Sequence, residues 1–231
     1  MRNKGIMIVL IAAAGMAACM HKTDTPSPPV VNNPGNPNPA DTGICFERDI
    51  LPVFVSNCAK AGCHDAASAQ DGYVLTNYEN ITRKGIVKGN ANKSKIYEAL
   101  IEDDEEDRMP LSPNPPLSAD LINLIARWIN LGAQYGTGCV SGCDSNTFSY
   151  SAAVAKITDR YCKGCHNTAA PSAGIALDTY EGVRSIAASG RLLGAVQHRS
   201  GFAPMPQGGS KLSTCEIRQI EKWVSAGMPN N

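Results

Sequence analysis

An internal repeat limits the folds that this chain can adopt. Residues 71–81 match residues 173–183, and both segments carry glycine, leucine and a Tyr-Glu pair at the same positions. Residues 117–129 match residues 212–224 in the same way, with a Leu-Ser start and a tryptophan near the end. Two copies of one pattern in a single chain predict two related folding units.

The boundaries of the two units follow from the repeat. We place them at 44–138 and 142–231, each reading as an opening helix, a cysteine motif, an irregular middle, a Met-Pro pair and a closing helix. No segment alternates apolar and polar residues as a half-buried strand would. The fold class predicted is therefore all-α, with two tandem domains and long loops.

The closing helices give the strongest periodic signal. In the first unit, apolar residues recur at the spacing of one helix face, namely Leu121, Leu124, Ile125, Trp128 and Ile129. Ser118 is a fitting N-cap and Gly132 a fitting stop; in the second unit Ser213 and Glu216 have capping-box spacing, and Gly227 ends the helix. The opening helices are marked by shorter apolar sets, which are Ile50, Leu51 and Phe54 in one unit and Val154, Ile157 and Tyr161 in the other.

The second unit contains the motif Cys162-Lys-Gly-Cys165-His166. Two thiols one helical turn apart can add to the two vinyl groups of a haem, and the adjacent histidine then reaches the iron. The alternatives are a zinc knuckle, a redox dithiol and a plain disulfide. Zinc would need further Cys or His ligands close by, and a redox dithiol gives no reason for the histidine. The motif therefore predicts covalent haem c.

The first unit carries Cys58-Ala-Lys-Ala-Gly-Cys63-His64, in which the spacer has four residues in place of two. The Cys-His ending is kept, the motif has the same place in the repeat, and a longer spacer can bulge while both sulfurs reach the haem. We predict a second haem c here. The alternative is a degenerate repeat in which Cys58 and Cys63 form a disulfide.

Each motif is followed by a Met-Pro pair before the closing helix, at Met109 and Met205. A thioether is a soft ligand that suits Fe(II) and raises the reduction potential of a histidine-ligated haem. Both methionines could instead be packing residues, but their matching position favours ligation. His198 is a rival sixth ligand in the second unit, with contact to a haem propionate or to solvent as the other roles considered.

The order of opening helix, Cys-x-x-Cys-His motif, Met-Pro pair and tryptophan-bearing closing helix resembles the class I cytochrome c domain, twice over, across residues 44–231. The resemblance implies that the two end helices of each unit cross, with Trp128 and Trp223 at the crossings. It also implies His64 with Met109 and His166 with Met205 as axial pairs. The four-residue spacer and the additional cysteines depart from the family pattern.

Those additional cysteines are Cys45, Cys139, Cys143 and Cys215. Our first expectation is that Cys45 pairs with Cys139 and Cys143 with Cys215, so that each bond ties together the ends of one unit. Four cysteines allow three pairings. The main rival joins Cys139 to Cys143 and Cys45 to Cys215.

The N-terminus predicts export. A short basic start and an apolar stretch, too short to span a bilayer comfortably, end at Ala17-Ala18-Cys19. This resembles a lipoprotein signal peptide over 1–18 with Cys19 as the lipidated residue; an ordinary secretory signal is the alternative. Residues 19–43 are rich in proline and asparagine and predict a tether. The expected location is a bacterial membrane, on its periplasmic face or at the cell surface.

The function expected from the sequence is the transfer of single electrons between extracytoplasmic redox proteins by two haem c groups, an electron carrier more than an enzyme. The alternative is a dihaem peroxidase-like oxidoreductase with one open iron site. Basic and acidic residues balance at 21 each, which gives no electrostatic case for nucleic acid binding. The acidic run 103–107 beside Met109 either steers a basic partner or is simply solvated.

Overall fold

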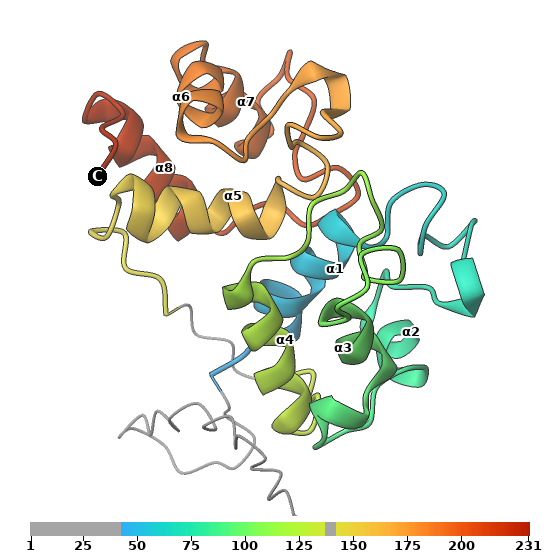
Figure 1. Cartoon of the computed structure of the whole chain (residues 1–231). Helices are drawn as coiled ribbons and strands as arrows, with labels where there is room; N and C mark the ends of the chain where they lie inside the picture. The colour runs from blue at the N-terminus through green and yellow to red at the C-terminus, as the bar shows by residue number, and fades with distance from the viewer. Residues whose placement is uncertain (1–42, 137–141) are drawn as a thin grey trace, which may run out of the picture. The chain divides into compact units, whose positions relative to one another are not determined.

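The computed structural model describes residues 43–136 and 142–231 (Figure 1). The predicted signal peptide 1–18, Cys19, almost all of the tether and Cys139 lie outside these residues. In the described part of the chain every regular element is helical, which agrees with the all-α prediction. None of the described helices is long and apolar enough to cross a bilayer.

The first half contains four α-helices and three short turns of other helix types. Its elements are η1 (Phe46–Ile50), α1 (Leu51–Asn57), η2 (Gln70–Gly72), α2 (Tyr78–Arg83), η3 (Ala91–Lys93), α3 (Lys95–Leu100) and α4 (Ala119–Asn130). The second half follows with η4 (Tyr150–Val154), α5 (Ala155–Tyr161), η5 (Ser172–Gly174), α6 (Tyr180–Ala188), α7 (Arg191–Val196) and α8 (Thr214–Ser225).

The closing helices α4 and α8 begin and end where the sequence predicted. The hydroxyl of Ser118 accepts a hydrogen bond from Leu121 N–H, which satisfies one of the free donors at the start of α4. In α8, Ser213 and Glu216 form the complete capping box. Gly132 and Gly227 follow the two helices with positive φ, which is the conformation that ends a helix at glycine.

The opening helices are confirmed, and each is preceded by a helical turn that was not predicted. A π-helical turn leads into each of them, η1 into α1 and η4 into α5. Pro52 lies in the first turn of α1, as the sequence predicted.

The middle segments were expected to be irregular, and this expectation was wrong in part. Short helices form there, α2 and α3 in the first half and α6 and α7 in the second. Asn77 and Thr179 start α2 and α6 as N-caps, each accepting a backbone N–H with its side chain. These helices are too short to show a clear apolar period, so packing stabilises them more than local preference does.

Each half has its own apolar core, and the same contacts recur in both. The indole of Trp128 donates to Gln134 O at 2.8 Å, and that of Trp223 donates to Pro229 O at 2.9 Å. Beside Trp128 lies the ring of Phe46, at 5.6 Å between centroids. Tyr150 lies in the same way beside Trp223, at 5.8 Å. Both tryptophans thus contact the opening segment of their own half, as expected of crossing end helices.

Helix α1 of the first half packs against helix α5 of the second. Ser56 Oγ lies 2.8 Å from Arg160 O, an acceptor that shares its proton with Pro52 O, and the Arg160 guanidinium lies 3.4 Å from Asp49 Oδ1. The two halves therefore share an interface that includes polar contacts made by the opening helices.

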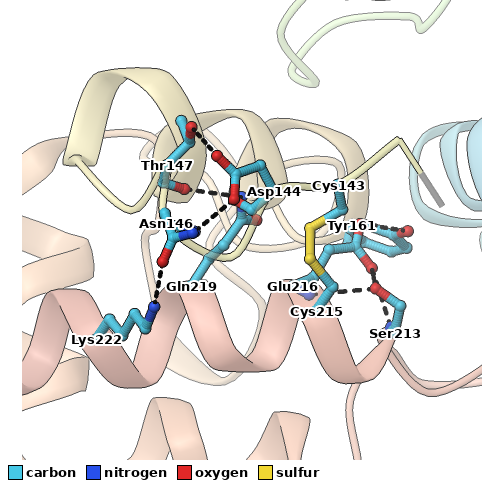
Figure 2. The surroundings of a disulfide bond; sticks show 10 residues. All are labelled: Cys143, Asp144, Asn146, Thr147, Tyr161, Ser213, Cys215, Glu216, Gln219 and Lys222. Carbon is cyan, nitrogen blue, oxygen red and sulfur yellow. Dashed lines mark hydrogen bonds between the residues drawn. A yellow bond between two sulfur atoms is a disulfide. The ribbon is translucent and has the colours of Figure 1, made fainter.

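A disulfide joins Cys143 to Cys215 in the first turn of α8 (Figure 2). Next to it, Gln219 donates to Asp144 O at 3.0 Å and to Thr147 O at 2.8 Å. The bond is the first of the pairings expected for Cys143, and it rules out the rival bond to Cys139. Cys45 is also disulfide-bonded, while its expected partner Cys139 lies outside the described residues.

Candidate haem sites

The second motif begins where α5 ends, at Tyr161. Cys162 O accepts hydrogen bonds from the backbone N–H groups of Cys165 and His166, at 3.1 and 2.9 Å. These two bonds fold the motif into a single turn, with both thiols and the imidazole on a short backbone. Main-chain hydrogen bonds thus hold the C-x-x-C-H motif in this turn independently of a cofactor.

The ring of His166 is held in one orientation by a backbone carbonyl. Its Nδ1 lies 3.1 Å from Ser172 O. A carbonyl oxygen can only accept a hydrogen bond, so Nδ1 carries a proton and Nε2 is the nitrogen left to bind a metal. A neutral imidazole oriented by a carbonyl bond at its other nitrogen is the usual form of a metal-binding histidine.

Met205 lies on a loop that is tied down at its backbone. Met205 N–H donates to Ala195 O at 3.1 Å, and His198 Nε2 donates to Met205 O at 3.0 Å. His198, considered from the sequence as a rival ligand, therefore engages the Met205 carbonyl in this structure. Its exposed ring helps to hold the methionine loop.

His166 and Met205 line one cavity with a volume of about 650 Å³. The two motif cysteines, Cys162 and Cys165, line it as well, so the predicted attachment and axial residues of the second site converge on a single space. That volume is in the range of cavities that take cofactors and other small molecules. The residues of the second site fit a covalently attached haem with a histidine and a methionine at its iron.

The first motif has the same backbone plan despite its longer spacer. His64 N–H donates to Cys58 O at 3.1 Å, as His166 does to Cys162 O. Leu75 N–H donates to His64 O at 2.9 Å, and Leu177 N–H makes the matching bond to His166 O at 2.8 Å. The two added residues therefore leave the backbone hydrogen bond between His64 and Cys58 in place. The chemistry of this donor set, two thiols and an imidazole, also fits haem c.

The two histidines differ in the hydrogen bonding of Nδ1. Among the described residues, the buried Nδ1 of His64 has no hydrogen-bond partner, whereas that of His166 has one. The ring of His64 stands edge-on to Tyr73, with 6.1 Å between centroids. The first site therefore orients its histidine by packing, without the carbonyl bond found at the second site.

Met109 has the same backbone support as Met205. Its N–H donates to Ala99 O at 2.8 Å, and its side chain packs against the core of the first half. The acidic residues just before it are exposed. One of them, Glu105, forms an ion pair with Arg108 at 3.3 Å. Met109 thus holds the equivalent place in the first half.

The motif thiols are free and partly buried. Burial raises the pKa of Cys58 to about 12 and that of Cys162 to about 12, and it raises the pKa of Cys165 as well. A thiol with so high a pKa supplies almost no thiolate at neutral pH, which disfavours a redox dithiol. The alternative disulfide between Cys58 and Cys63 is absent. No cluster of three or more metal-binding side chains occurs in the described part of the chain.

Comparison with known proteins supports the same class. Residues 61–112, which include Cys63, His64 and Met109, match the family model of Planctomycete cytochrome C. This match supports a cytochrome c-type family, and with it covalently attached haem and haem-based electron transfer in general. No curated protein and no solved structure gave a significant match.

Sequence reasoning missed two groups of residues at the second site. Ser172 supplies the carbonyl that fixes the His166 ring, and a main-chain oxygen leaves no trace in residue type. Leu51 and Val55 of α1 line the cavity of the second site, although they belong to the first half. The sequence signal for such a close approach is Gly164 in the second motif, where a Cβ atom would lie 2.0 Å from Ser56 O.

Proposed function

We propose that this chain is an exported cytochrome with two haem c groups, one per repeat, that passes single electrons between extracytoplasmic redox proteins. The observation that carries the proposal is the convergence of Cys162, Cys165, His166 and Met205 on one cavity. The same main-chain bonds recur at His64 and Met109, and the residues of the family match support haem at the first site.

The roles of the side chains follow from this arrangement. Cys58 and Cys63 attach one haem and Cys162 and Cys165 the other, and each haem supplies a one-electron Fe(III)/Fe(II) couple. The imidazoles of His64 and His166 are the first axial ligands. The thioethers of Met109 and Met205 are the second, and a thioether ligand raises the reduction potential. Two ligands on each iron favour a carrier over a peroxidase-like enzyme, which needs an open site.

The predicted location and organisation belong to the same proposal. The two repeats are cytochrome c-like domains at 44–138 and 142–231. Cleavage after Ala18 leaves Cys19 to be lipidated, and the tether at 19–43 holds the domains near a membrane. Cytochrome c domains are typically extracytoplasmic, and the disulfide between Cys143 and Cys215 supports the same location.

The number of haems is tested by mass spectrometry of the purified, denatured protein. We expect two covalent haem additions, and one addition in each of two variants, Cys58→Ala/Cys63→Ala and Cys162→Ala/Cys165→Ala. The matched pair separates the two sites. A single addition to the wild-type chain that survives loss of Cys58 and Cys63 would show that the first motif carries no haem.

Axial ligation is tested by spectroscopy of the same protein. The oxidised form should show the weak far-red band of thioether–iron ligation, reduced in Met109→Ala and again in Met205→Ala. The reduced wild-type protein should not bind carbon monoxide. Ready binding at one haem would support the peroxidase-like alternative for that site. Mass spectrometry of the N-terminal peptide checks the lipid on Cys19.

A further inference from the structure

The cavity of the second site is not built from the second half alone. Helix α1 of the first half forms part of its lining through Leu51, Pro52, Val55 and Ser56. Leu51 and Val55 are only partly buried, and both lie on the lining of this cavity. An apolar wall excludes water from a haem and so raises its reduction potential. The first half therefore supplies apolar surface to a site whose attachment residues belong to the second.

The contact between α1 and the second motif is unusually close. Cys165 Sγ lies 3.5 Å from Ser56 O. A Cβ atom added to Gly164, the neighbouring residue, would lie 2.0 Å from that same oxygen, far inside van der Waals contact. Only glycine at position 164 lets the end of α1 approach the motif this closely.

The long spacer of the first motif reaches the second motif directly. Lys60, within the four-residue spacer, donates from Nζ to Gly164 O at 2.8 Å and also to Asn114 Oδ1. The single proton of Ser56 Oγ is shared between Pro52 O at 2.7 Å and Arg160 O at 2.8 Å, and Arg160 lies two residues before the second motif. Three polar contacts thus fasten the end of α1 and the following spacer to the backbone around Cys165.

We propose that helix α1 of the first half is a wall of the second haem pocket, and that Ser56, Lys60 and Gly164 are positioning residues that hold this wall against the haem. The inference rests on the proposed function, because it assumes a haem at Cys162 and Cys165. It goes further in making the second site a composite of both repeats. The environment of the second haem is then set partly by the first half.

Proton NMR of the reduced dihaem protein tests the wall directly. The ring current of a haem shifts the resonances of methyl groups beside it. The variant Val55→Thr should therefore remove a shifted methyl resonance. Val87→Thr, the same change at an exposed position of the first half, should leave those signals unchanged. The Val55 methyl resonances should keep their ring-current shift in Cys58→Ala/Cys63→Ala and lose it in Cys162→Ala/Cys165→Ala. The reverse dependence would assign α1 to the first haem alone and overturn the proposal.

The potentials give a second readout that a purely structural role would not move. Val55→Thr adds a hydroxyl to the wall, which favours Fe(III), so one of the two midpoint potentials should fall while Val87→Thr leaves both unchanged. Gly164→Ala should lower the same potential by forcing α1 away from Cys165. Gly142→Ala, at an open position, is its matched control. Unchanged potentials in both test variants would overturn the proposal.

The haem count separates this inference from the proposed function. If the wild-type chain carries no haem at Cys162 and Cys165, the proposed function fails and the wall proposal falls with it. If both haems are attached and the Val55 and Gly164 variants behave as their controls do, only the wall proposal fails.

Discussion

The disulfide between Cys143 and Cys215 gives a quantitative prediction about the stability of the second half. Its cysteines are separated by 72 positions in the sequence. In the chain-entropy model, a cross-link of this span lowers the entropy of the unfolded chain by about 15 cal/mol/K. At room temperature this corresponds to about 4 kcal/mol. We therefore expect Cys143→Ser/Cys215→Ser to lower the free energy of unfolding by about 4 kcal/mol.

The folded state offers reasons why the effect should arise mainly in the unfolded chain. Both cysteines are only half-buried, so serine at these positions leaves little unfilled space. The segment after Cys143 is also bound to α8 without the disulfide (Figure 2). Gln219 donates to Asp144 O and Thr147 O, and Lys222 donates to Asn146 Oδ1 at 3.0 Å.

Urea unfolding, followed by far-ultraviolet circular dichroism, measures the effect. With a denaturant dependence of about 2 kcal/mol/M, the loss of about 4 kcal/mol should lower the urea midpoint by about 2 M. Gln219→Ala is the matched control, since it removes two hydrogen bonds and keeps the cross-link. It should cost about 1 to 2 kcal/mol. A drop of less than about 0.5 M in the serine variant, or a larger drop in the control, would refute the entropic reasoning.

Two further predictions concern buried aromatic side chains of the second half. Tyr161 donates to Glu216 Oε1 at 3.0 Å, and burial, followed by the charge of Glu216, raises its pKa above 10.0. Above that pH the unfolded chain releases a proton that the folded protein keeps, so stability should fall. Wild-type protein should therefore lose more stability between neutral and strongly alkaline pH than Tyr161→Phe, and equal losses in urea titrations would contradict this. Trp223→Phe removes the hydrogen bond to Pro229 O and some buried volume, so it should lower the free energy of unfolding by about 2 kcal/mol. An unchanged thermal midpoint would show that this helix crossing contributes nothing to stability.

Local patterns in the sequence were enough to place the elements that carry the motifs. The capping box of Ser213 and Glu216 and the apolar face of α4 are each encoded within a few residues, and both appear in the structure as expected. The short helices α2 and α7 were not predicted, because six residues show too little periodicity. The orientation of the His166 ring was also unreadable, since its partner is the main-chain oxygen of Ser172.

The haem-site residues were predicted from the sequence alone, since the spacing of Cys162, Cys165 and His166 is a local property. The repeat of that pattern was also visible there. The approach of Ser56 O to Cys165 Sγ and the position of α1 along the cavity of the second site became apparent in the tertiary structure. Contacts between residues so far apart in the chain depend on how two packed halves meet. No periodicity, cap or motif within either half encodes that meeting, beyond the missing side chain at Gly164.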